Sequence, residues 1–173
     1  MTPNQTGRRA AAAGKAPEKA RDLAGARARA KAIGPLLEGC AAIDRQVRAA
    51  VRTLTRGSGI TGPQWGILGV FAGPEGPFSV AEAARRIGQT RQSVQGIADL
   101  LADKALIEFR PDPNHRRTKL VTVTDSGRAL LRKLRARQTR WTRQVASHLD
   151  GNDVETALQF TRHIRAHLAD QSQ

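Results

Sequence analysis

The sequence predicts a mainly α-helical fold with one small β-hairpin, and three observations lead to this fold class. Apolar residues recur at helical spacing through most of residues 33–170. Near residues 107–123 apolar and polar residues instead alternate, as in half-buried strands. Capping residues and glycines divide the helical part into short central helices and long terminal ones. We therefore expect a compact central domain over residues 60–124, flanked by long helices on both sides.

Residues 1–32 have a composition of their own. They are rich in alanine and contain eight basic residues against two acidic ones. No apolar stretch in them is long enough for a secretory signal or a membrane span. We expect a basic, flexible N-terminal arm. Two roles stay open for it: a partly helical solubilising tail, or an arm that follows a nucleic-acid backbone without base preference.

The first long helix is predicted over residues 33–56. Its apolar stripe has steps of three and four residues, at Leu36, Cys40, Ile43, Val47, Ala50 and Leu54. A Gly57-Ser58-Gly59 loop then precedes a second helix, for which Thr61 and Gln64 form a capping box with Pro63 in the first turn. A glycine- and proline-rich segment, residues 73–77, ends this helix.

Two short helices joined by a tight turn follow. Ser79 and Glu82 form a second capping box, and Gly88 ends the first of the two helices. Thr90 can cap the next helix, which turns one apolar side inward and exposes Gln92 and Gln95. Glutamine can bridge N6 and N7 of adenine in a major groove, so these residues are candidate base contacts. Taken alone, the pair also fits an ordinary helical hairpin.

A basic β-hairpin completes the central domain. Ile107 and Phe109 alternate with polar residues before a loop over residues 111–118, as Val121 and Val123 do after it. A basic hairpin tip beside a helix-turn-helix pair is placed to enter a minor groove. The order of elements is that of a winged helix-turn-helix.

Residues 125–170 are predicted to form two more helices. Thr124 can cap the first, which we expect to run to about Leu149, and Asp150-Gly151-Asn152 separates it from the last one. Both carry apolar stripes. Together with the helix over residues 33–56 they have more apolar surface than the central domain can cover, which predicts dimerisation helices at both ends and a second copy of the chain as partner.

The net charge narrows the class of partner. The formal charge is +14 over 173 residues and the pI is about 11.6, which favours polyanions such as nucleic acid. A ribosomal or membrane-surface protein is compatible with the same charge. Aromatic residues make up only 3%, so stacking platforms for single strands are not expected. A single cysteine excludes an internal disulfide and suits the cytoplasm.

Residues 61–131 resemble the MarR family of bacterial winged-helix transcription regulators. The matching pieces are Pro63-Gln64-Trp65, Ser79-Val80-Ala81-Glu82-Ala83-Ala84, Thr90-Arg91-Gln92-Ser93-Val94, Pro111-Asp112-Pro113, Arg116-Arg117 and Val123-Thr124 to Gly127. The sequence departs from the family pattern at two positions. His115 replaces the aspartate that usually braces the wing, and Gly96 stands where many members have an arginine.

The resemblance implies a homodimer that binds an inverted repeat in double-stranded DNA, usually as a repressor, and a small aromatic or phenolic effector that releases it. Trp65 is the candidate residue for the effector pocket. Cys40 is a candidate oxidant sensor, because some members of the family sense peroxides through a cysteine in the first long helix. The DNA-binding residues expected from the helices and the wing are Ser79, Thr90, Arg91, Gln92, Ser93, Gln95, Arg110, His115, Arg116, Arg117 and Lys119.

Other classes of function find less support in the sequence. A protein that coats DNA without sequence preference could use the same basic arm, and competition by bulk DNA distinguishes it from a regulator. His163 and His167 have a spacing that can hold a metal, although it also fits solvated histidines, and we expect neither a metal nor another cofactor. No phosphate-binding glycine loop or local nucleophile pattern indicates an enzyme.

Overall fold

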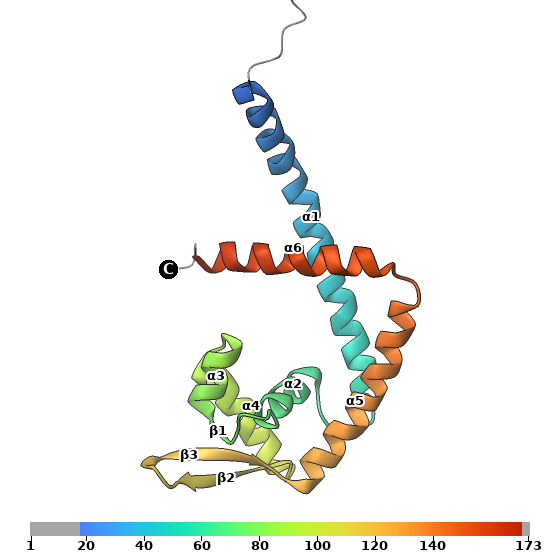
Figure 1. Cartoon of the computed structure of the whole chain (residues 1–173). Coiled ribbons are helices and arrows are strands. Elements are labelled where there is room, and N and C mark those ends of the chain that lie inside the picture. The colour runs from blue at the N-terminus through green and yellow to red at the C-terminus, as the bar shows by residue number, and fades with distance from the viewer. Residues whose placement is uncertain (1–17, 171–173) are drawn as a thin grey trace, which may run out of the picture. The chain divides into compact units, whose positions relative to one another are not determined.

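A computed structural model describes residues 18–170 of the chain, apart from a few side chains within this range (Figure 1). The chain divides into two compact units, and the second begins at Arg48. The elements follow the order α1 (Glu18–Thr55), α2 (Gly62–Phe71), β1 (Phe78–Ser79), α3 (Val80–Ile87), α4 (Arg91–Asp103), β2 (Ile107–Asp112), β3 (His115–Val123), α5 (Asp125–Ala146) and α6 (Gly151–Asp170). The predicted fold class, mainly helical with a small β wing, is confirmed.

Helix α1 begins earlier than the sequence indicated. The prediction placed its start near residue 33, whereas the helix begins at Glu18 and runs through Pro35 without a break. Alanine, arginine, lysine and glutamate dominate the added turns, and all four have high helix propensity. Part of the predicted flexible arm is thus helical, and its first 17 residues lie outside the described part of the chain.

The predicted helix boundaries within the central domain are confirmed by their caps. The Thr61–Gln64 and Ser79–Glu82 capping boxes both have their two reciprocal hydrogen bonds. Gly88 ends α3 in the left-handed region at φ +65°, where a side chain would be strained. The Thr90 side chain accepts a hydrogen bond from the Ser93 N–H at the start of α4. These contacts set where α2, α3 and α4 begin and where α3 ends.

The sheet has three antiparallel strands in the order β1-β3-β2, one more than the sequence predicted. The additional strand, β1, is only two residues long and pairs Phe78 with Val121. The hairpin loop is also shorter than the predicted residues 111–118, because both strands extend into it. The Asn114 N–H donates to Asp112 Oδ1 at 2.9 Å, and this local hydrogen bond stabilises the tight turn that joins β2 to β3.

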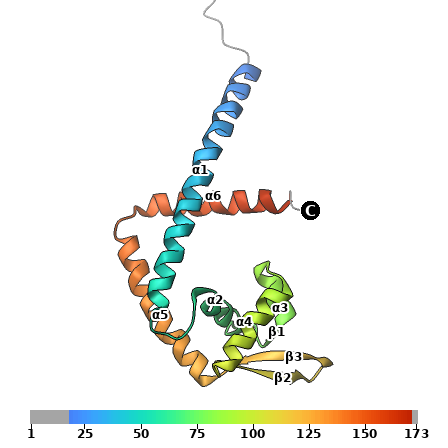
Figure 2. The same ribbon diagram turned by 180° about the vertical axis from the view of Figure 1, so that it is seen from behind.

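One hydrophobic core holds the central domain together. Leu68, Val94, Leu101, Ile107, Val121 and Leu134 are its largest fully buried side chains, and they come from α2, α4, both wing strands and α5. Helix α2 packs between α4 and α5, and β2 and β3 extend together away from α5 (Figure 2). We call residues 60–134, which contain this core, the winged lobe.

The C-terminal helices leave apolar side chains uncovered. Helix α5 ends at Ala146 rather than near Leu149, because a turn and the Asp150 side chain, which accepts from the Asn152 N–H, redirect the chain. Val154, Leu158 and Leu168 of α6 are exposed. None of the helices within residues 18–170 is long and apolar enough to cross a membrane.

Candidate nucleic-acid interface

Helix α4 presents a polar face because its opposite face is anchored in the core. Val94, Ala98 and Leu101 are fully buried. The predicted contact residues at its start are exposed: Thr90, Arg91, Gln92 and Ser93. Their side chains therefore project from a helix end that the core and the Thr90 cap hold in place. A helix held in this way can enter a major groove with its first turns foremost.

Gln95 and Asp99 lie one turn further along the same helix. The Gln95 Nε2 donates to Asp99 Oδ1 at 2.8 Å, and Gln95 is half-buried while Asp99 is exposed. Between them, Gly96 is exposed, and a Cβ added there would meet no atom within 4 Å. The predicted base contact Gln95 thus has a partner that sequence reasoning missed. The spacing of four residues on one helix was the available signal.

Ser79 differs from the other predicted contacts. It is only 9% exposed, and its hydroxyl both accepts from the Glu82 N–H and donates to the Glu82 carboxylate at 3.1 Å. The Ser79 side chain therefore serves as a helix cap, and its contact with DNA stays a prediction. Hydrogen bonds from the Ser79 backbone and side chain lower the pKa of Glu82 below its usual value, with a smaller contribution from Arg85 and Arg86.

The wing carries its charge on both strands. Arg110 on β2 is exposed and forms an ion pair with Glu108, with 3.0 Å between the Arg110 Nη2 and the Glu108 Oε2. His115 and Lys119 on β3 are exposed, and Lys119 pairs in register with Pro111. The backbones of Arg116 and Arg117 belong to β3, whereas their side chains lie outside the described part of the structure.

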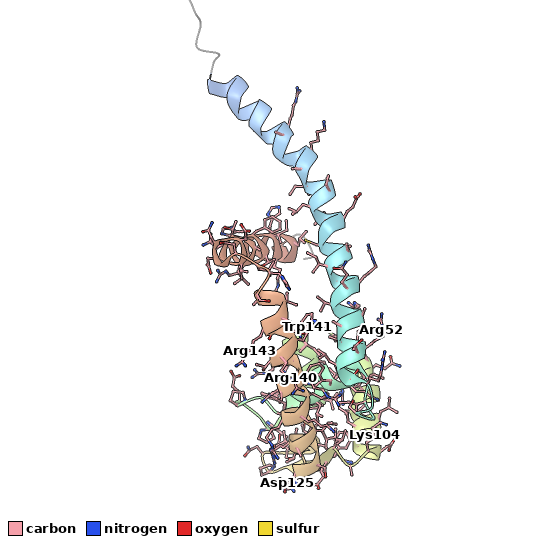
Figure 3. The ribbon with its side chains drawn as sticks, turned by 90° about the vertical axis from the view of Figure 1, so that its right-hand side faces the viewer. Arg52, Lys104, Asp125, Arg140, Trp141 and Arg143 are labelled. Carbon is pink, nitrogen blue, oxygen red and sulfur yellow. The ribbon has the colours of Figure 1, made fainter. Side chains whose placement is uncertain are left out.

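An arginine of α5 binds the backbone of the segment that precedes α2. Sequence reasoning missed this contact. The half-buried Arg137 donates through Nη1 to the backbone oxygens of Leu54 at 2.8 Å and Arg56 at 3.1 Å. Leu54 belongs to the last turn of α1 and Arg56 follows its end, a place where backbone oxygens lack helical partners and attract cations. Other cations of α5, including Arg140 and Arg143, are exposed (Figure 3).

The two candidate sensor residues have different environments. Trp65 is half-buried and packs against the core. A nearby open hollow of about 260 Å³ is lined by other residues, namely Pro63, Gly66, Ile67, Val70, Ile87, Gln89 and Ile97. Cys40 is exposed in the single chain, where the apolar stripe of α1 is also uncovered, and its role as an oxidant sensor stays a prediction. Within the described residues, no group of three or more His, Cys, Asp or Glu side chains could hold a metal ion.

The sequence is similar to a family profile and to several known proteins. The sequence profile described as MarR family matches residues 58–118. A protein of Mycobacterium tuberculosis is 36% identical over 104 residues, 60% of this chain and 68% of the relative. The transcriptional activatory protein BadR of Rhodopseudomonas palustris is 30% identical over 59% of this chain and 60% of its own length. The transcriptional repressor NicR of Pseudomonas putida is 38% identical over 32% of this chain and 35% of its own length.

Solved structures share the fold at lower identity. The MarR family regulator SP03579 matches with a TM-score of 0.75 at 19% identity, covering 84% of this chain and 96% of that one. CouR from Rhodococcus jostii, solved with p-coumaroyl-CoA, has a TM-score of 0.65 at 22% identity, covering 76% and 90%. A Staphylococcus aureus MepR mutant, solved with an oligodeoxyribonucleotide, has a TM-score of 0.53 at 19% identity, covering 77% and 97%.

Proposed function

Because this chain belongs to the MarR family of transcriptional regulators, we propose that it binds double-stranded DNA in a sequence-specific manner. In this proposal the start of α4 enters the major groove and the β2–β3 wing contacts the adjacent minor groove. The observation that carries it is the exposed row Thr90–Ser93 on a helix whose other face is fixed in the core. The MepR structure with an oligonucleotide supports it by analogy.

The proposed binding unit is a homodimer on an inverted repeat. Large apolar side chains that a soluble monomer rarely leaves uncovered are exposed on α1 at Ile43 (61%) and on α6 at Leu158 (51%). A second copy would cover them by twofold symmetry. The two α4 helices would then reach successive major grooves, roughly 34 Å apart, so the target would have two half-sites about one helical turn apart.

We further propose that the dimer is a repressor that a small aromatic or phenolic molecule releases. CouR, solved with p-coumaroyl-CoA, and the repressor NicR support this direction, whereas BadR is described as an activator. The half-buried Trp65 on α2 is the proposed effector contact. A ligand with a tenfold preference for the released conformation supplies about 1.4 kcal/mol of coupling free energy.

Selection of bound sequences from random duplexes, followed by competition against bulk DNA, tests the main proposal. We expect the selection to return an inverted repeat. The amount of bulk DNA needed to displace the protein from this repeat should be at least a thousandfold greater than the amount needed to displace it from an unrelated duplex. Gln92→Ala should weaken binding by about 1–3 kcal/mol at one base position. Arg117→Ala should weaken binding to all duplexes and flatten the salt dependence. Equal binding to every duplex would instead support the DNA-coating function.

A further inference from the structure

Helix α5 carries a row of arginines along one of its sides. Arg128, Arg132, Arg135 and Arg143 follow one another at steps of four, three and eight residues, with Thr139 between the last two, so they share one face of the helix. All four arginines are exposed. At a rise of about 1.5 Å per residue, the row is roughly 22 Å long. We call these four residues the arginine stripe.

The arginine stripe has little negative charge beside it. Asp125 is the only acidic residue of α5, which has seven basic ones. The Asp125 Oδ1 lies 3.7 Å from the Arg128 Nε, and an ion pair as exposed as this one binds weakly. The other three arginines form no ion pair within residues 18–170. The stripe therefore presents positive charge that the described part of the chain does not neutralise.

The stripe and the proposed contacts of α4 face different sides of the winged lobe. Leu131 and Leu134 of α5 are buried in the same core as Val94 and Leu101 of α4. Helix α2 packs between the two helices (Figures 1 and 2). Because both helices turn their apolar sides toward one core, their exposed sides point outward in different directions. A duplex in contact with the start of α4 therefore leaves the stripe open.

The chemistry of the stripe fits a phosphate backbone. A guanidinium group can bind a phosphate through two parallel hydrogen bonds. From Arg128 to Arg135 the steps along the helix axis are about 4.5–6 Å, between one and two phosphate steps of about 3.4 Å in one DNA strand. The stripe contains no large apolar side chain, which a helix lying on a membrane would insert among the lipids. A second copy of the chain has the same net charge of +14 and is repelled.

We propose that the arginine stripe binds the phosphate backbone of a second duplex segment without base preference. The protein then holds two DNA segments at once, one through α4 and the wing and the other through α5. This inference goes beyond the sequence-specific binding proposed above, which uses only the first of these surfaces.

A capture experiment tests the second surface. The full chain is bound to an immobilised duplex that carries the selected inverted repeat, and a labelled duplex of unrelated sequence is added at several salt concentrations. We expect the parent to capture the labelled duplex. Arg132→Gln/Arg135→Gln removes two phosphate contacts, so the affinity for the labelled duplex should fall about tenfold, and its slope against salt on logarithmic axes should flatten by about 1.8. The affinity for the repeat should stay within about twofold of the parent value, because the stripe is remote from α4.

Lys133→Gln/Arg140→Gln is the matched control. It removes the same charge from two exposed positions of α5 that lie about a third of a turn around the helix from the stripe. Salt screens charges that do not touch the duplex, so capture should fall by less than about twofold. The circular dichroism of both double variants should match that of the parent, since all four positions are exposed.

Three results would overturn the proposal. They are a parent that captures no second duplex, an equal loss of capture in both double variants, and undiminished capture by Arg132→Gln/Arg135→Gln. Vesicles of phosphatidylcholine and phosphatidylserine provide a further arm, in which loss of vesicle binding by this variant with unchanged capture would assign the stripe to a membrane instead. A parent that selects no repeat would overturn the proposed function alone, because direct binding of the labelled duplex to the parent and the two double variants still tests the stripe.

Discussion

The winged lobe and helix α6 use apolar residues in opposite ways. In the lobe, Leu68, Val94 and Leu134 are completely buried, and residues distant in sequence fill the same core. In α6 no side chain within residues 151–168 is buried, although Leu158 and Leu168 recur at helical spacing. The difference teaches that a single chain completes the core of the lobe but leaves several apolar side chains of α6 exposed. The lobe is held by apolar contacts within one chain, whereas the exposed apolar side chains of α6 are open to contact by a further surface.

The largest change in stability is expected for a substitution at Gly127, where the core of the lobe is tightly packed. A Cβ at this position would lie 2.2 Å from the backbone oxygen of Leu106 and 2.8 Å from Val123 Cγ1. The backbone oxygen cannot rotate away as a side chain can. Gly127→Ala should therefore reduce the free energy of unfolding by about 3 kcal/mol, measured by urea denaturation.

Gly96→Ala is the matched control for this substitution. It adds the same methyl group to an exposed position in the middle of α4, where nothing lies within 4 Å. Alanine has the higher helix propensity, so we expect the free energy of unfolding to rise by about 0.5–1 kcal/mol. Equal effects of the two substitutions would show that Gly127 is not in close contact with the α4–β2 turn.

The parts of the fold that could be predicted from sequence are those determined by neighbouring residues. Capping boxes join residues three apart, and Gly88 ends α3 by its own backbone conformation, so both were visible in a linear pattern. Strand β1 was not visible. It consists of Phe78 and Ser79 only, and it exists because β3, about 40 residues later, provides its hydrogen-bond partners. No local signal marks such a pair.

The candidate site shows the same division. The exposed start of α4 follows from helical periodicity, and it was predicted correctly as a surface. The carboxylate partner of Gln95 lies four residues away, yet it was not recognised because an exposed Asp99 has many alternatives in solvent. The contact of Arg137 with Leu54 spans 83 positions and goes to a backbone oxygen, so side-chain patterns could not reveal it. The residue type of Ser79 suits both a helix cap and a phosphate contact, and the structure shows the cap.

The next prediction concerns the uncovered side of α6. If a second copy covers it, Leu158→Asp should weaken dimerisation by roughly 2 kcal/mol, about 30-fold, because a charge would replace a buried apolar side chain. Sedimentation velocity over a concentration series measures this shift. Hydrogen exchange of the buried amides of α4 should stay as in the parent, since Leu158 is not part of the core of the winged lobe.

Gln159→Asp introduces the same charge one residue later, away from the apolar side of α6. The Gln159 side chain is exposed and donates a hydrogen bond to Glu155. Replacing Gln159 should leave the dimerisation constant unchanged. A parent that is monomeric at every concentration would contradict the proposal. So would a Leu158→Asp dimer as stable as the parent.

A smaller effect is expected where α1 meets the lobe. Arg137→Ala removes two hydrogen bonds from a cation to backbone carbonyls, so the free energy of unfolding should fall by about 1.5 kcal/mol. Hydrogen exchange of the amides from residue 53 to residue 58 should accelerate locally. Arg140→Ala, which removes an exposed arginine of the same helix, should change neither quantity by more than about 0.5 kcal/mol. Equal effects would show that the contacts of Arg137 do not stabilise this junction.

The smallest effect is expected at Glu82, within the capping box that starts α3. Hydrogen bonds from Ser79 lower its pKa in the folded chain, so the folded state binds this proton less readily than the unfolded state does. The resulting stability is present above the ordinary carboxyl pKa of about 4.3 and is lost as the pH falls through the lower, folded pKa. Glu82→Gln keeps an acceptor for the Ser79 N–H but has no charge. The parent should therefore be the more stable protein at pH 7, and the difference should shrink between pH 5 and pH 3 in urea denaturation. A difference that stays constant over this range would mean that hydrogen bonding alone, without the charge, accounts for the cap.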